Sequence, residues 1–219
     1  MNILQVSHYP IANAITGGQR RVRNLQILLR KSGFNVQHIA VCPRRSDLSK
    51  RDIALSPLLH EWVFQVPHDF EMRISHAVEL DNSFFTDVRA HLRWVKPSIV
   101  WLEHPFLWPV ISKCFAKLPV VYSAHNIEWK MKRQTLKASS IFDLSCLESL
   151  RAAEEDLARR ASLVVCCCND DRKYFETINK SCLTISNGSD PPIVRNPEAA
   201  WRELDARARC FCGAHLYLC

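Results

Sequence analysis

The residues best suited to chemistry follow an apolar run that begins at Val120. The run is typical of a strand buried on both faces, and His125, Asn126 and Glu128 come directly after it. Ligands of open parallel sheets bind beyond the carboxyl ends of the strands. An imidazole there could act as a base or a hydrogen-bond donor, because its ordinary pKa lies near neutrality, although a single histidine is more often structural. The stretch therefore predicts His125 as a catalytic residue, with Asn126 and Glu128 as substrate-binding residues.

Two further groups of residues are candidates for the same site. Glu103 and His104 follow another apolar run, and we expect them to face the same crevice. Gly17 and Gly18 precede a basic helix, where glycines let a ligand approach the backbone and free N–H groups can bind an anion. The pair is also compatible with an ordinary loop. Arg21, one turn into that helix, completes the predicted substrate-binding set.

Motifs that would indicate a different chemistry are absent. The chain contains neither the dinucleotide pattern G-x-G-x-x-G, nor the P-loop, nor a G-x-S-x-G elbow, nor any Asp-x-Asp pair that could clamp a metal-bound diphosphate. Cys210, Cys212, His215 and Cys219 have residue types that bind zinc, but their spacing fits no standard module. The sequence thus predicts neither a metal nor a cofactor.

The ten cysteines and the hydropathy indicate the compartment. Polar and basic residues interrupt the N-terminus, so no signal peptide is predicted, and the thiols are expected to be reduced and structural. The most apolar long window, residues 105–124, contains Lys113 and Lys117, which disfavour a membrane-spanning helix. We expect a cytoplasmic protein, with peripheral association on the inner face of the membrane as an open alternative.

The net charge of +7 is concentrated near the N-terminus. Residues 1–51 hold nine Lys and Arg against one acidic residue, a net charge of +8, and the remainder carries −1. Residues 20–51 could therefore attract phosphate groups, anionic lipid or nucleic acid. A solvated helix face is an equally good interpretation. No recognised nucleic-acid module accompanies the charge, so nucleic acid is the least favoured partner.

Alternating strands and helices predict the fold. The hydrophobic patterns predict strands at 2–7, 35–42, 61–66, 98–102, from 120, 162–167 and 183–185. They predict helices at 19–31, 82–95, about 107–117 and 143–161, a helix capped by Asn169, and a helical or irregular segment at 127–137. This order indicates an α/β fold: a single Rossmann-like, doubly wound domain with a mainly parallel sheet and helices on both faces.

The order of these pieces resembles family 4-type glycosyltransferases of the two-Rossmann-domain (GT-B) architecture. Ser162, Cys168 and Ser186 depart from the residues usual in that family. The resembling segments are the first strand with Gly17-Gly18 before a basic helix, the strand end Tyr122–Trp129, the helix and strand from Glu154 to Cys168, and the hinge-like Ile185–Asp190.

This resemblance implies the N-terminal, acceptor-side half of a transferase. Such enzymes move a sugar from a nucleotide-diphosphate-sugar donor to a hydroxyl of a sugar or lipid-linked acceptor, usually with retention and without a metal. Gly17 and Gly18 would approach the donor diphosphate, and His125 would lie beside the transferred sugar. The resemblance also implies domain boundaries: residues 1–186 as the acceptor-side domain, 187–208 as a linker and 209–219 as a remnant of the second domain's first strand. We therefore expect a truncated chain whose activity is impaired.

Two alternatives remain open at this point. One is a non-catalytic Rossmann-like module that binds a phosphorylated ligand or an anionic membrane through residues 20–51. The other, which is weaker, is a sugar-nucleotide epimerase or a phosphorylase, since these share the two-domain architecture.

Overall fold

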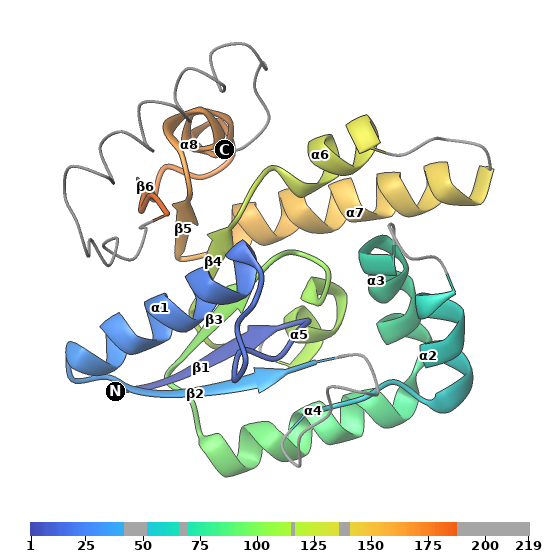
Figure 1. Cartoon of the computed structure of the whole chain (residues 1–219), viewed down its shortest axis with the longest axis horizontal. Coiled ribbons are helices and arrows are strands. Elements are labelled where there is room, and N and C mark those ends of the chain that lie inside the picture. Colours follow the sequence, from blue (N-terminus) through green and yellow to red (C-terminus); the bar gives the residue numbers. More distant parts are fainter. Residues whose placement is uncertain (42–51, 66–69, 115–116, 136–140, 188–219) are drawn as a thin grey trace, which may run out of the picture. The chain divides into compact units, whose positions relative to one another are not determined.

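The computed structural model describes residues 1–41, 52–65, 70–114, 117–135 and 141–187 (Figure 1). The chain divides into two compact units, Met1–Ser186 and Asn187–Cys219. All described helices and strands belong to the first unit. The predicted linker and strand remnant lie outside the described residues apart from Asn187.

Six parallel strands form one sheet, in the order β2-β1-β3-β4-β5-β6. Parallel neighbours require crossover connections, and helices supply them. The sheet confirms the predicted α/β, doubly wound fold. Its strands are β1 (Asn2–Ser7), β2 (Asn35–Ala40), β3 (Ile99–Glu103), β4 (Val120–Ala124), β5 (Leu163–Cys166) and β6 (Cys182–Thr184).

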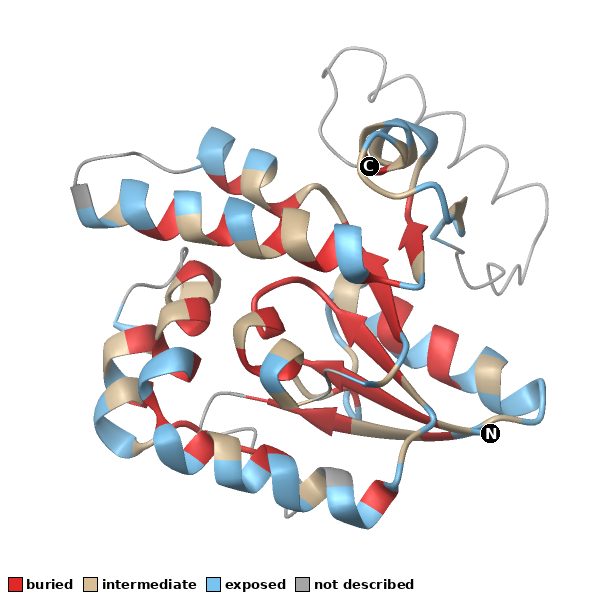
Figure 2. Ribbon diagram, turned by 180° about the vertical axis from the view of Figure 1, so that it is seen from behind, coloured by how far each residue is buried: buried red, intermediate tan, exposed pale blue. Residues whose placement is uncertain are grey.

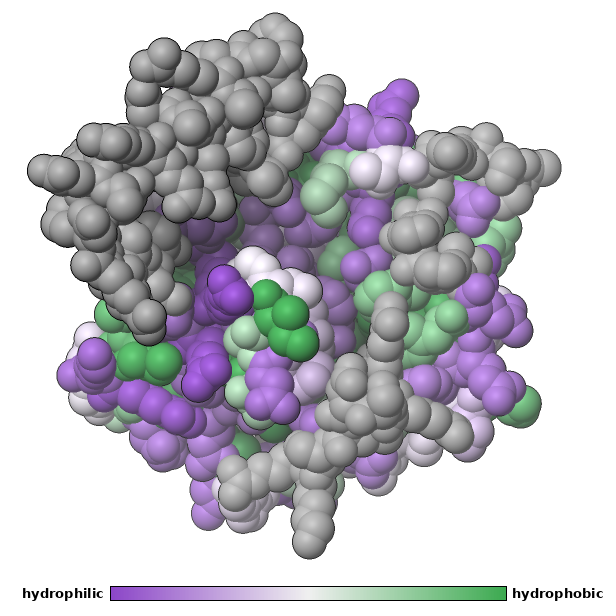
Figure 3. Space-filling view, in the orientation of Figure 1, coloured by the Kyte–Doolittle hydropathy of each residue, from purple (hydrophilic) through white to green (hydrophobic). Residues whose placement is uncertain are grey.

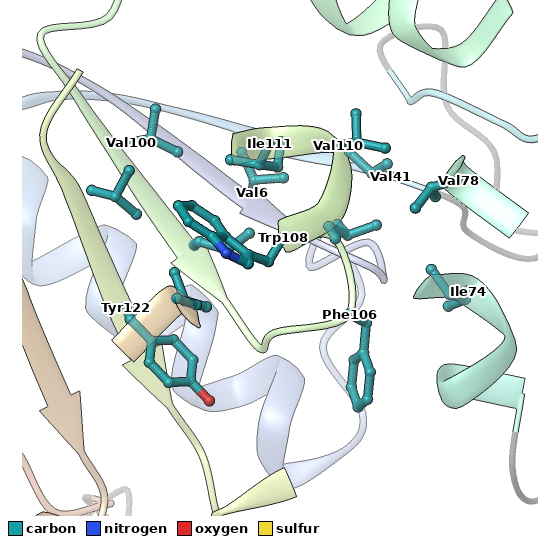
Figure 4. Packing of buried hydrophobic residues seen from close by; sticks show 14 of the residues in the cluster. Val6, Val41, Ile74, Val78, Val100, Phe106, Trp108, Val110, Ile111 and Tyr122 are labelled. Atoms are coloured by element: carbon teal, nitrogen blue, oxygen red, sulfur yellow. The ribbon is translucent and has the colours of Figure 1, made fainter. Parts of the chain in front are cut away.

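Helices cover both faces of the sheet, as predicted, but unequally (Figure 2). Only α1 among the described helices contributes to the smaller buried cluster, in which Leu25 packs with Ile3 and Val121. The larger cluster lies on the other face, where Trp108 and Ile111 of α5 face strand side chains such as Val100 (Figure 4). The helices are α1 (Gly17–Lys31), α2 (Pro57–Phe64), α3 (Phe70–Leu80), α4 (Asn82–Val95), α5 (Trp108–Cys114), α6 (Glu128–Thr135), α7 (Ile141–Arg160) and α8 (Asn169–Glu176).

The prediction of a strand at 61–66 is wrong. Residues 61–64 belong to α2, which begins at Pro57, a residue whose fixed φ suits the first helical position, and residue 66 lies outside the described residues. The alternation of aromatic residues suggested a strand, yet the buried residues are His60 and Val63, which are three apart and share one side of a helix. The following helix, α3, was not predicted either, although five of its residues are buried.

Smaller differences concern the ends of elements. The cap of α8 is Cys168 and not Asn169, because the Cys168 sulfur accepts from the Asp171 N–H. Segment 127–137, predicted as helical or irregular, contains α6. The final strand, β6, is only half-buried.

Two further observations concern the cysteines and the helices of the described residues. All six cysteines among the described residues are free: Cys114, Cys146, Cys166, Cys167, Cys168 and Cys182. None of the described helices has the length and apolar character needed to cross a bilayer.

We expect replacement of Asp81 by alanine to lower the free energy of unfolding by about 2 kcal/mol. Its carboxylate caps α4 by accepting the N–H groups of Ser83 and Phe84, and it also accepts the N–H of Ser56 at the start of α2. Chemical denaturation measures the loss. Asp81→Asn keeps one acceptor oxygen and should lose about half as much. Equal stability of the alanine variant and the wild type would show that the cap contributes nothing.

Candidate functional site

The site begins with a buried pair at the ends of β3 and β4. The register places Glu103 opposite Ser123, so the two strands end side by side and His125 follows immediately after β4. His125 Nε2 lies 3.1 Å from Glu103 Oε2, and the Gln5 amide donates to Glu103 Oε1 at 2.8 Å. The same amide donates to the Val22 carbonyl of α1. Glu103 is therefore held from two sides and itself holds His125.

This pairing determines which form of His125 is present. Burial lowers the pKa of His125 to about 4, with His104 adding to the effect and Glu103 opposing it, so the ring is neutral at pH 7. Burial raises the pKa of Glu103, but hydrogen bonds from His125 and Gln5 outweigh it and the net pKa is lowered. A carboxylate can only accept, so His125 carries its hydrogen on Nε2 and keeps a lone pair on Nδ1. The ring can accept a hydrogen bond from a ligand.

A second histidine–carboxylate pair lies against the first. His104 Nδ1 is 3.0 Å from Glu128 Oε1, and His104 Nε2 is 3.0 Å from the Tyr9 hydroxyl. The rings of His104 and His125 have centroids 4.0 Å apart. His104 thus joins the Glu128 carboxylate to the Tyr9 hydroxyl through its two ring nitrogens. His104 has a φ of 67°, a left-handed conformation that is uncommon for residues other than glycine and typical of functional sites.

A third carboxyl, Glu154 of α7, fixes the segment that carries Glu128. Glu154 accepts the Tyr122 hydroxyl at 2.6 Å and the N–H groups of Glu128 and Trp129 at 3.0 Å each. It thereby caps α6 from a neighbouring helix. Burial raises the pKa of Glu154 to about 8, and the Glu128 carboxylate adds to the shift.

The N-terminus of α1 lies on the other side of His125. A β-carbon added to Gly18 would lie 3.0 Å from the Tyr9 hydroxyl and 3.7 Å from His125 Nδ1, whereas one added to Gly17 would meet nothing within 4 Å. A capping box between Thr16 and Gln19 uses the Gln19 N–H. The Gly17 and Gly18 N–H groups lie in the first turn of α1, where the helix offers no acceptor, and they make no hydrogen bond with the described residues.

The structure thus brings most of the predicted site residues together. Glu103 and Glu128 are fully buried, so each can influence a ligand only through its histidine. Arg21 is buried and donates from Nη1 to the Ile185 carbonyl, just before the boundary between the two units. Asn126 is half-buried, and its side chain makes no hydrogen bond with the described residues.

Sequence reasoning missed Gln5, Tyr9 and Glu154. Gln5 stands out in retrospect as a polar residue inside an apolar strand, which is a signal of a buried hydrogen bond. Tyr9 and Glu154 gave no comparable signal, because their partners are distant in sequence.

Two other features of the described residues concern metal ligands and a pocket away from the candidate site. No group of three or more metal-ligating side chains is found in the described part of the chain. A pocket of about 320 Å³ lies among α3, α5 and α7, and its lining contains none of the residues of the candidate site.

Comparisons with known proteins give a consistent result. The family model described as Glycosyltransferase Family 4 matches residues 15–191. No curated protein matches the sequence at the significance required.

Several solved structures share the fold at low sequence identity. Sucrose-phosphate synthase from Thermosynechococcus elongatus superposes with a TM-score of 0.65 at 14% identity, covering 93% of this chain and 52% of that one. Os79 from O. sativa in complex with UDP superposes with a TM-score of 0.51 at 9% sequence identity, covering 84% of this chain and 50% of that one. UDP-GlcNAc 2-epimerase from Methanocaldococcus jannaschii superposes with a TM-score of 0.50 at 11% sequence identity, covering 85% of this chain and 46% of that one. The chain thus spans about half the length of these proteins, and the similarity shows the fold alone.

Proposed function

The chain belongs to glycosyltransferase family 4, and from that membership we propose that it supplies the acceptor-side half of a GT-B enzyme that transfers a sugar from a nucleotide-sugar donor to an acceptor hydroxyl. The observation that carries this proposal is the orientation of His125. Its Nε2 is occupied by Glu103, and its Nδ1 lies beside the first turn of α1 at Gly18.

The first turn of α1 and the ring of His125 face each other, and each suits one part of a nucleotide-sugar. The Gly17 and Gly18 N–H groups, at the positive end of a 15-residue helix, would bind a diphosphate oxygen. Neutral His125 would accept a hydrogen bond from a hydroxyl of the transferred sugar. UDP in the Os79 complex supports a nucleotide-linked donor.

The reaction follows from what these groups can do. Transfer leaves a nucleoside diphosphate as the leaving group, and N–H donors and positive potential stabilise its developing charge. We propose a retaining reaction that needs no metal, with His125 as a positioning hydrogen-bond acceptor rather than a proton donor, because its pKa of about 4 leaves it neutral. Asn126, whose side chain makes no hydrogen bond with the described residues, would bind the sugar or the acceptor. The remaining donor contacts would come from a second domain, so we expect little turnover from the 219-residue chain alone.

Replacing Gly18 by alanine should weaken nucleotide-sugar binding on the order of tenfold, because the new methyl group displaces Tyr9 and fills the space in front of His125. The measurement is an NMR titration of the chain with a panel of UDP-, ADP- and GDP-sugars, following the backbone amides. We expect one member to shift the Gly17–Gln19 amides and the His125 ring.

Gly17→Ala is the matched control, because its methyl group meets no atom of the described residues within 4 Å. It should keep the Tyr9–His104 hydrogen bond and the stability of the wild type. If no nucleotide-sugar shifts the signals of this site, or if the Gly18→Ala variant binds as tightly as the wild type, the proposed donor site is wrong.

A further inference from the structure

The outer side of α1 carries a continuous exposed stripe. The stripe begins at Arg20, and its other members follow Arg20 by three, four, seven, eight and eleven positions, which is the spacing of one helix face. The opposite side of the helix, with Val22 and Leu25, is buried against the sheet. The α1 stripe consists of Arg20, Arg23, Asn24, Ile27, Leu28 and Lys31, and all six are exposed.

The charge of the α1 stripe is uncompensated. The helix contains no acidic residue, and the side chains of Arg20, Arg23 and Lys31 form no ion pair within the described part of the chain. On α7 and α8 the pattern differs. There, exposed cations such as Arg151 and Arg172 pair with a carboxylate four residues along the same helix. The α1 stripe is therefore not an ordinary salt-bridged surface.

Two aliphatic side chains lie among these cations. Ile27 is 39% exposed and Leu28 is 57% exposed. In the space-filling view, hydrophobic and hydrophilic side chains lie next to one another over α1 (Figure 3). Cations flanking exposed aliphatic residues on one helix face are the pattern of a helix that lies in the interface of a bilayer.

We propose that the α1 stripe docks the protein on an anionic lipid surface. The three cations would pair with acidic headgroups while Ile27 and Leu28 enter the acyl boundary. Two other partners fit the stripe less well. A second copy would oppose cation to cation, and a nucleic acid would leave the aliphatic pair in water.

Docking has a consequence for the acceptor, and this step rests on the proposed function. The first turn of α1 belongs to the candidate site, and the helix is roughly 22 Å long at 1.5 Å per residue. A stripe on this helix would hold His125 within that distance of the headgroups. An acceptor hydroxyl carried by a lipid is therefore favoured over a free sugar.

The test is sedimentation of the 219-residue chain with vesicles of phosphatidylcholine alone and of phosphatidylcholine with about one-third phosphatidylglycerol. The chain should bind only the anionic vesicles, and binding should fall as salt rises from about 0.1 to 0.5 M. Arg23→Glu with Lys31→Glu should reduce the partition coefficient at least about 25-fold, since each cation contributes roughly fivefold. Arg20 stays unchanged because it adjoins the candidate site.

The control is Arg93→Glu with Lys96→Glu, which makes the same change of charge at an exposed residue of α4 and at an exposed residue just after it. This control should bind like the wild type. Circular dichroism of both double variants checks that they fold. Equal binding by the α1 double variant and the wild type would overturn the proposal, as would equal binding to neutral vesicles. A concentration-dependent dimer, or DNA binding, that disappears in the α1 variant without any vesicle binding would assign the stripe to another partner. Nucleotide-sugar titration of the α1 variant is independent of these results, so a failure of docking is distinguishable from a failure of the donor site.

Discussion

Acidification from pH 7.5 to 5 is expected to lower the free energy of unfolding by about 3 to 4 kcal/mol, before carboxyl groups with ordinary pKa values titrate. Burial lowers the pKa of His38 and of His125 from 6.5 to about 4, and it lowers the pKa of His8 well below its ordinary value. The unfolded chain therefore takes up protons between pH 6.5 and 4 that the folded chain cannot. The contribution of each histidine to stability is complete above pH 6.5 and falls as the pH drops, by about 2 kcal/mol at pH 5 and by about 3 kcal/mol once the pH is below 4.

One carboxyl acts in the opposite direction. The raised pKa of Glu154, about 8, means that the folded chain binds a proton between pH 8 and 4.5 that the unfolded chain does not. Its contribution grows as the pH falls and offsets about one histidine. Between pH 6.5 and 5, the slope of the free energy of unfolding against pH should thus correspond to about two protons taken up on unfolding.

Chemical denaturation at a series of pH values measures this slope directly. His38→Gln keeps an amide donor for the Ser7 hydroxyl and removes one titrating group, so its slope should be smaller by about one proton. A free energy of unfolding that stays constant between pH 7.5 and 5 would show that these histidines are accessible to protons in the folded state.

Replacement of Glu154 by alanine is expected to lower the free energy of unfolding by about 3 to 5 kcal/mol. The carboxyl is fully buried and accepts the Tyr122 hydroxyl and the Glu128 and Trp129 N–H groups. Alanine would leave these three donors without an acceptor and would open a cavity. The start of α6 would loosen, and Glu128 would hold His104 less firmly.

Thermal or chemical denaturation measures this loss, and proton NMR of the histidines reports the state of His104. Glu154→Gln keeps the shape and one acceptor oxygen and should cost about 1 kcal/mol. Glu148→Ala, an exposed change on the same helix, should cost less than about 0.5 kcal/mol. If Glu154→Ala is no less stable than Glu148→Ala, the carboxyl does not secure α6.

The sequence was most informative where one rule acts locally. A buried parallel strand needs a largely apolar run, and such runs predicted all six strands closely, including β4 with His125 immediately beyond it. The glycine pair before a basic helix predicted the start of α1 in the same way. The strand predicted at 61–66 was wrong because a short apolar run fits a strand and a helix equally well, and here Pro57 favoured the helix.

Tertiary structure alone decided what each site residue does. Glu103 and Glu128 read alike in the sequence, as acids near a strand end, and both were assigned to substrate. The register of β3 against β4 instead turns Glu103 toward His125, and the cap from Glu154 fixes Glu128 against His104. The sequence by itself determined which residues stand at the edge of the sheet, because strand patterns are local. Partner, burial and protonation state depend on residues tens to nearly a hundred positions away, and only packing brings those together.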